Sequence, residues 1–80
     1  MKVRVEVGLR PGVLDPEATT IERSLHGMGF TDVQGLRQTR VFEFELDAPS
    51  PAEAEARARA MCEKLLANPV TESYRLSLGS

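Results

Sequence analysis

The sequence predicts an α+β fold, a ferredoxin-like βαββαβ two-layer sandwich with two helices on one face of an antiparallel sheet. Two observations support this prediction. Apolar residues alternate along residues 2–9, 40–47 and 70–78, as they do in half-buried strands. Residues 15–29 and 50–68 instead carry apolar residues at spacings of three and four and begin with helix-capping residues. With a weaker strand at 31–38, the order is strand, helix, strand, strand, helix, strand, which this topology packs most economically.

The first predicted strand ends in a tight turn. Its inward face carries Val3, Val5, Val7 and Leu9. The alternation stops at Arg10, and Pro11-Gly12 is the favoured central pair of a type II turn. A helix then begins, because Asp15 can cap the free amides and Pro16 fits the first helical turn. Its predicted buried stripe consists of Ala18, Ile21, Leu25 and Met28, and Gly29 is expected to end it in the left-handed conformation.

The middle of the chain predicts two strands of unequal quality. Residues 31–38 have Val33 and Leu36 as their only large apolar residues, and Gly35 between them suggests a bulge. Residues 40–47 alternate well, with an inward face of Phe42, Phe44 and Leu46. In the predicted topology the first strand lies between the third and the fourth. Lys2 and Arg4 would therefore face Glu43 and Glu45 on the open side of the sheet, where opposite charges stabilise strand pairing.

The second helix is predicted from a capping box and an apolar stripe. Ser50 and Glu53 have the capping-box spacing, and Pro51 occupies the first helical position. The predicted buried residues are Ala54, Ala58, Met61, Cys62 and Leu65. Asn68-Pro69 should stop the helix, and the last strand should turn Tyr74, Leu76 and Leu78 inward.

Composition predicts a single domain, residues 1–80, and excludes several classes of function. Ten Lys and Arg against twelve Asp and Glu give no basic excess for nucleic acid. No apolar run is long enough to span a membrane, and the alternating N-terminus is unlike a signal peptide. A single cysteine, Cys62, suits a reducing cytoplasm and excludes an internal disulfide framework. So small a sandwich with open sheet edges is expected to form a homo-oligomer, a homodimer or homotetramer.

Candidate catalytic groups are scarce. His26 is expected to be an exposed helix histidine, because it lies off the apolar stripe. Cys62 is expected to be a buried packing thiol, and one His with one Cys cannot form a tetrahedral metal site. The sequence contains no phosphate-binding glycine-rich motif. We therefore predict no catalytic, cofactor-binding or metal-ligating residues in this chain.

Three stretches together resemble a known family. They are Leu9–Pro16 (LRPGVLDP), Ile21–Leu25 (IERSL) followed by Gly29-Phe30, and Met61–Val70 (MCEKLLANPV). In this combination, over essentially the whole length, the chain resembles the small PurS-type subunit of phosphoribosylformylglycinamidine (FGAM) synthase, an enzyme of purine biosynthesis.

The resemblance implies a non-catalytic role within a ligase complex. The holoenzyme converts formylglycinamide ribonucleotide, glutamine and ATP to formylglycinamidine ribonucleotide, glutamate, ADP and phosphate. A glutaminase subunit releases ammonia, and a large ATP-dependent synthetase subunit, which would use ATP and Mg, activates the formamide oxygen. The small subunit would bind no cofactor and would bridge the two enzymes so that ammonia passes between them.

Two segments are candidate partner interfaces. The first is the turn after the first strand, and the second is the end of the second helix; their residues are Arg10, Pro11, Gly12, Val13, Leu14, Asp15, Asn68 and Pro69. Apolar residues on a rigid loop are typical of interfaces. Alternatively, the first segment only turns the chain, with Val13 and Leu14 capping the core, and Asn68-Pro69 only ends a helix.

A competing function is an ACT-like regulatory module that binds a small metabolite at a dimer interface. Such modules share the predicted element order and need a glycine-containing turn after the first strand, which Pro11-Gly12 loosely provides. An independent small enzyme is a weaker third interpretation, because the residues for it are missing.

Overall fold

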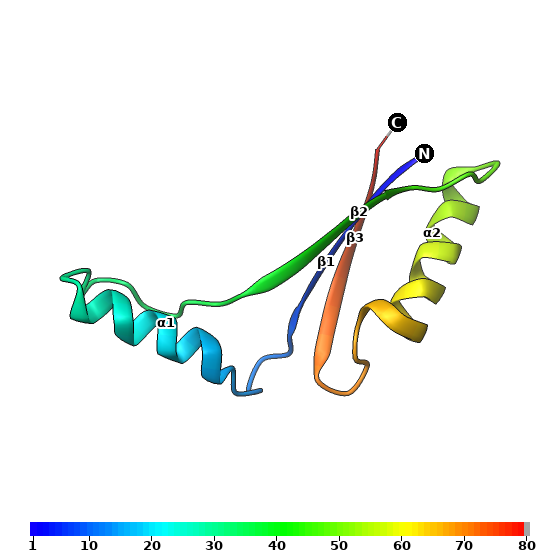
Figure 1. Ribbon diagram of the computed structural model, residues 1–80. Coiled ribbons are helices and arrows are strands. Elements are labelled where there is room, and N and C mark those ends of the chain that lie inside the picture. The colour runs from blue at the N-terminus through cyan, green and yellow to red at the C-terminus, as the bar shows by residue number, and fades with distance from the viewer. Residues whose placement is uncertain (80) are drawn as a thin grey trace.

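The computed structural model describes residues 1–79. Its elements in chain order are β1 (Lys2–Leu9), α1 (Pro16–Gly27), β2 (Thr39–Glu45), α2 (Pro51–Met61), the π-helical turn η1 (Cys62–Leu66) and β3 (Glu72–Gly79). The strands form one antiparallel sheet in the order β2-β1-β3 (Figure 1). The predicted α+β sandwich class and the central position of the first strand are thus confirmed.

One face of the sheet holds the core. Val3, Val5 and Val7 of β1 are buried there. Their register neighbours on the two outer strands share this face, so that Val5 lies between Phe42 and Leu76. α2 and the start of η1 cover the face with three small buried residues, Ala54 and Ala58 of α2 and Cys62 of η1. Small side chains allow a helix to approach a sheet of valines closely. The apolar alternation predicted for these three strands is confirmed.

The opposite face is polar and open. Arg4 lies opposite Glu43 in the register, and its Nη1 lies 3.6 Å from Glu43 Oε1. Lys2 lies opposite Glu45, whose Oε2 is 3.4 Å from the amino terminus of Met1. The charge matching predicted across β1 and β2 is therefore confirmed.

The predicted strand at 31–38 is wrong. Residues 31–38 are turns and irregular backbone that return alongside α1. Side chains of α1 hold this segment, since Glu22 Oε1 accepts from Leu36 N at 3.0 Å and His26 Nε2 lies 2.7 Å from the carbonyl oxygen of Val33. Gly35 has a φ of +64° in a bend and forms no bulge. A segment without apolar alternation offers too little apolar area to compete for a place in the sheet.

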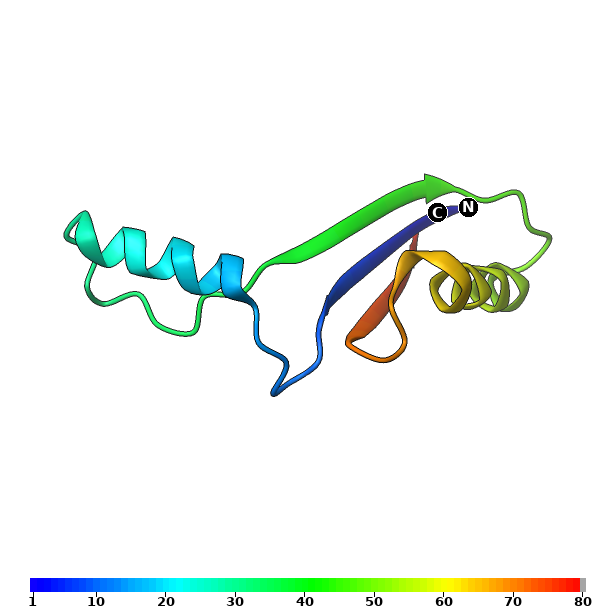
Figure 2. The same ribbon diagram turned by 60° about the horizontal axis from the view of Figure 1, so that its bottom comes forward.

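α1 projects beyond the end of the sheet, on the side opposite α2 (Figures 1 and 2). The radius of gyration is therefore 16.1 Å, whereas a compact chain of this length has one of about 12 Å. The prediction that α1 buries an apolar stripe is wrong for the single chain. Only Ala18 of that stripe is buried, while Ile21 is exposed and Met28 is 71% exposed.

The second helix departs from its prediction at its C-terminal end. Leu65 was expected to be buried and is 84% exposed. The reason is the change from α-helix to π-helix at Cys62, where Ala67 N donates to the Cys62 carbonyl at 3.0 Å. A π-turn holds more residues than an α-turn, so the residues after Cys62 rotate away from the predicted stripe.

Candidate protein-interaction surface

The turn after β1 has the predicted type II character. Val13 N donates to the Arg10 carbonyl at 3.1 Å, and Gly12 has a φ of +86° at the third position. Asp15 then caps α1, because its Oδ1 accepts from Ala18 N at 3.0 Å. Leu14, between the turn and the cap, is 77% exposed. Leu14 therefore does not cap the core, which was the alternative interpretation of this segment.

The second candidate segment is a short, well-bonded loop between η1 and β3. Asn68 Oδ1 accepts from Val70 N at 2.9 Å, so the asparagine side chain closes its own turn around Pro69. Val70 follows this turn and is 79% exposed. Val70 was predicted only as the start of the last strand. The signal that could have identified it is an apolar residue directly after Asn-Pro.

Arg10 brings the two segments together. Its Nη2 donates to the Pro69 carbonyl at 3.0 Å, and its backbone N donates to the Thr71 carbonyl at 2.8 Å. The structure thus joins two segments that lie 59 residues apart in the sequence. We call the joined region the turn surface; its residues are all exposed and are Arg10, Pro11, Gly12, Val13, Leu14, Asn68, Pro69 and Val70. Asp15, also predicted as an interface residue, is half-buried as the cap of α1.

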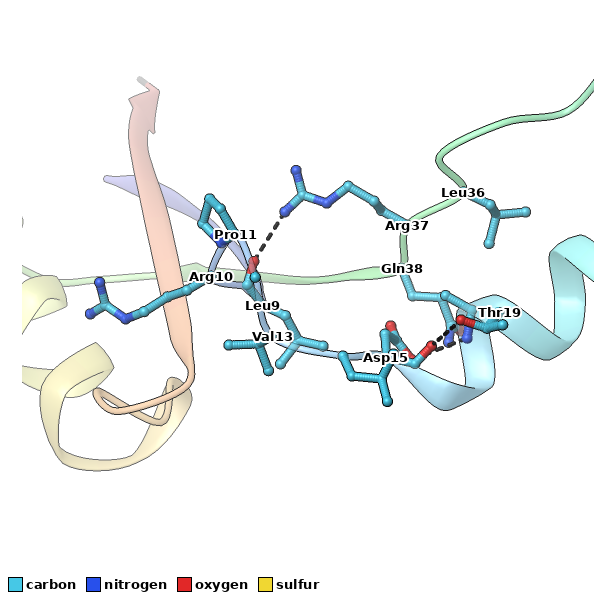
Figure 3. Close-up of a pocket in the computed structure, with 12 residues that line it drawn as sticks. Leu9, Arg10, Pro11, Val13, Asp15, Thr19, Leu36, Arg37 and Gln38 are labelled. Carbon is cyan, nitrogen blue, oxygen red and sulfur yellow. Dashed lines mark hydrogen bonds between the residues drawn. The ribbon is translucent and has the colours of Figure 1, made fainter.

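A cavity of about 340 Å³ lies beside the turn, between it, the start of α1 and residues 36–38 (Figure 3). Arg37 Nη2 reaches across and donates to the Leu9 carbonyl at 3.1 Å. Thr19 Oγ1 donates to the Asp15 carbonyl at 3.1 Å. Several of the polar groups around the cavity are therefore engaged in fixing where α1 leaves the sheet.

Two further apolar regions are left uncovered by the described chain. The first is on α1 and just after it, where Ile21, Met28 and Phe30 are exposed. The second is a groove of about 350 Å³ beside η1, lined by Phe44, Met61, Lys64, Leu65 and Leu66. Exposed apolar regions of this kind indicate protein–protein contact.

The single thiol of the chain, that of Cys62, is not an activated nucleophile. Burial, with a smaller contribution from Glu63, raises the pKa of the Cys62 thiol, which therefore stays protonated at neutral pH. A hydrogen bond donated to Glu63 at 2.9 Å raises the pKa of Tyr74. The same residues contain no group of three His, Cys, Asp or Glu side chains placed to hold a metal ion. None of the helices in this part of the chain has the length and apolar character needed to cross a bilayer.

Comparisons with known proteins agree on one family. Residues 2–80 match the PurS family model, described as phosphoribosylformylglycinamidine (FGAM) synthase. The phosphoribosylformylglycinamidine synthase subunit PurS of Bacillus subtilis is 39% identical over 74 residues, covering 92% of this chain and 87% of that protein. The PurS subunit of Methanocaldococcus jannaschii is 32% identical over 77 residues, covering 96% of this chain and 93% of that protein.

Solved structures show the same likeness. A Bacillus subtilis PurS structure superposes with a TM-score of 0.90 at 37% identity, covering 99% of this chain and 98% of that chain. A chain of the PurLQS structure from Thermotoga maritima gives a TM-score of 0.88 at 34% identity, covering 95% of this chain and 93% of that chain. These matches cover nearly the full length of both aligned chains. Their sequence identities are well above those of proteins that share only a fold. The chain therefore belongs to the PurS family of FGAM synthase subunits, which act in purine biosynthesis.

Proposed function

We propose that this chain is the non-catalytic small subunit of FGAM synthase, bridging the glutaminase subunit and the large ATP-dependent synthetase subunit for ammonia transfer. The observation that carries the proposal is the near-complete match to a chain of the PurLQS structure. The Cys62 thiol is buried and its pKa is raised, which supports a packing role for this residue. In this proposal the subunit binds no cofactor, and ATP and Mg are used by the other subunits in the cytoplasm.

The turn surface is the proposed contact with the other subunits. It combines exposed apolar side chains, Leu14 and Val70, with backbone held by the type II turn and by Arg10. A loop that is already ordered loses little conformational entropy on binding. This supports docking through Arg10–Asp15 and Asn68–Pro69 in preference to a purely structural role for these segments.

Homo-oligomerisation is a second part of the proposal. Ile21 on α1 and Met28 and Phe30 just after it are exposed. No other helix or strand of the described chain lies against α1 in Figure 1. The groove beside η1, with Phe44 and Leu65, is apolar and open. A second copy could cover both regions reciprocally in a two-fold dimer, because each copy supplies one projecting helix and one groove.

Reconstitution tests the bridging function. The chain is mixed with the purified synthetase and glutaminase subunits, and complex mass and FGAM formation are measured with glutamine or with ammonium as nitrogen donor. We expect a three-component complex whose glutamine-dependent activity is lost without the chain, while ammonium-dependent activity remains. Full glutamine-dependent turnover by the other two subunits alone would refute the proposal.

Two variants test whether the chain is catalytically silent. His26→Ala and Cys62→Ala remove its only imidazole and its only thiol. We expect both reconstituted complexes to keep the glutamine-dependent rate once complex formation is saturated. A large loss of rate at full complex occupancy would assign this subunit a chemical role.

The second candidate function is the ACT-like metabolite module, which is favoured only by the cavity beside Pro11 and Gly12. Calorimetric titration of the isolated chain with amino acids and purine nucleotides separates the two functions. Saturable heat from a small ligand, with no affinity for the synthetase subunit, would favour the metabolite module.

A further inference from the structure

The helix that covers the sheet widens at its C-terminal end into the π-helical turn η1. Ala67 N donates to the carbonyl oxygen of Cys62 at 3.0 Å. A continuous α-helix would give that carbonyl to the amide of Leu66 instead. The π-turn therefore holds one residue more than the α-turn that could take its place.

This turn is not the common motif that ends a helix with a hydrogen bond of the same span. That motif needs a residue in the left-handed conformation after the helix. Among the residues that the structure describes, only three glycines have a positive φ, and none of them lies in or next to η1. Met61 and Cys62, where α2 passes into η1, have ordinary α-helical φ values of −62° and −61°. The backbone at this junction is therefore compatible with a π-turn and with an α-turn.

Two adjacent leucines make the two turns similar in the apolar area that they bury. In the structure Leu66 is half-buried against the core, whereas Leu65 is 84% exposed. In an α-helix Leu65 would follow Met61 and Cys62 at spacings of four and three, and would lie on the same buried stripe. One leucine would thus take the place of the other. The burial of a leucine side chain therefore does not decide between the turns.

A hydrogen bond ties the π-turn to the sheet. Tyr74 OH donates to Glu63 Oε1 at 2.9 Å, so the second residue of η1 is bonded to β3. Tyr74 packs against the core and holds its hydroxyl in a fixed position. A hydrogen bond of this kind changes an equilibrium between two states about twofold to tenfold. Such a contribution is decisive where apolar burial is nearly balanced.

We propose that residues 62–66 form a conformational switch between a π-turn and an α-turn, which the bond between Tyr74 and Glu63 holds in the π-turn. In the α-turn Leu65 faces the core and Leu66 faces solvent. Both leucines line the groove beside η1, so the switch sets the shape of that groove. The switch is a property of this chain alone and does not depend on the proposed bridging function.

NMR couplings across hydrogen bonds distinguish the two turns in the isotope-labelled full chain. The Cys62 carbonyl carbon couples to the amide nitrogen of Ala67 in the π-turn and to that of residue 66 in the α-turn. We expect the wild-type chain and Leu65→Ser to show the π-turn coupling. Leu66→Ser should populate both turns, because it removes the leucine that the π-turn buries and keeps the one that the α-turn buries.

The Leu66→Ser chain then serves as the background for testing the bond to the sheet. Adding Tyr74→Phe should lower the ratio of π-turn to α-turn about twofold to tenfold. Glu63→Ala should act alike, whereas Glu63→Gln keeps an oxygen that can accept from Tyr74 and should lower the ratio less. Arg57→Ala is the control, because Arg57 ties α2 to the Asp47 carbonyl at 2.9 Å, outside η1, and should leave the ratio unchanged.

The outcomes decide between a switch and a fixed turn. If Leu66→Ser shows only the π-turn coupling, with and without Tyr74→Phe, the turn has one state and the proposal is overturned. A ratio that is equal with and without Tyr74→Phe overturns it too, because the bond then does not act on the turn. Loss of folding does not imitate the expected result, since an unfolded chain shows neither coupling. If Leu66→Ser is unfolded, the milder Leu66→Ala takes its place as the background, with the same expected results.

Discussion

Arg10 and Pro69 are joined by a hydrogen bond of 3.0 Å from the Arg10 Nη2 to the Pro69 carbonyl oxygen. Arg10 directly follows β1, and Pro69 lies in the loop before β3. These two strands are antiparallel neighbours in the sheet. The side-chain bond therefore extends the β1–β3 pairing into the loops, where the Arg10 N bond to the Thr71 carbonyl already begins it. The turn surface is a continuation of the sheet, which explains how it can be both exposed and ordered.

Replacing Arg10 with alanine should weaken partner binding more than folding. The lost bond is exposed, so the free energy of unfolding should fall by only about 0.5–1.5 kcal/mol in urea titrations. Binding to the synthetase subunit, measured calorimetrically, should weaken by about 1–2 kcal/mol because the loop at Pro69 is less ordered.

Arg57→Ala is the matched control for this substitution. Arg57 Nη1 also donates to an exposed backbone carbonyl, that of Asp47 at 2.9 Å, at the other end of α2. It should cost similar stability and leave affinity unchanged. Equal losses of affinity in both variants would show that Arg10 has no special part in docking.

Gly12 should be intolerant of alanine for conformational reasons alone. Its φ is +86°, and a Cβ built at this position meets nothing within 4 Å. Gly12→Ala should therefore lower the free energy of unfolding by about 1–2 kcal/mol through backbone strain. Gly27→Ala is the control, because Gly27 also has open space around it but has an ordinary helical φ. Equal stability of the two variants would contradict the strain argument.

The sequence predicts the sheet better than it predicts what lies over the sheet. Alternation in β1 and β3 reports directly on burial, because the period of two has only one inward face, and Val5 and Leu76 lie where it places them. The caps Asp15 and Ser50 are local interactions and were equally predictable; both accept from the amide three residues on. The turn at Pro11-Gly12 follows from the backbone preferences of those two residues.

The wrong predictions concern tertiary packing, which a periodic sequence pattern does not specify. The stripe on α1 shows that one face of the helix is apolar, but it does not say whether that face meets its own sheet or another chain. The π-turn at Cys62 likewise depends on packing around a buried residue, and it rotates Leu65 into solvent. In the candidate site, the segments were predictable as loops, whereas their meeting through Arg10 and Pro69 required the fold.

A charge on the apolar stripe of α1 should dissociate the proposed oligomer. Met28→Asp places a carboxylate where burial against a second copy would be costly, so the mass measured by light scattering should fall to that of one chain. Arg23→Asp is the control, since Arg23 is exposed on the opposite side of the same helix and the substitution introduces the same carboxylate near the helix end. A monomeric wild-type chain at micromolar concentration, or an oligomer that survives Met28→Asp, would contradict the role of α1.

Because of Cys62, the free energy of unfolding should decrease as the pH becomes alkaline. Burial, then Glu63, raises the pKa of the folded thiol above its ordinary value of 9.0, while Arg59 partly opposes the shift. Between these two pKa values the unfolded chain has lost the thiol proton and the folded chain has kept it. The folded state therefore binds more protons, and the free energy of unfolding decreases as pH rises through this window, whereas the contribution is fully present below it.

Urea titrations from about pH 7 to about pH 11 measure this dependence, with Cys62→Ala as the variant that removes it. Tyr74 contributes in the same direction, because its raised pKa also favours the protonated folded state. The Tyr74→Phe variant separates the two groups, and the thiol contribution is the difference between Tyr74→Phe and the double variant. If that difference does not change with pH, Cys62 ionises in the folded protein as readily as in the unfolded chain, and the buried position of its sulfur at the start of η1 is wrong.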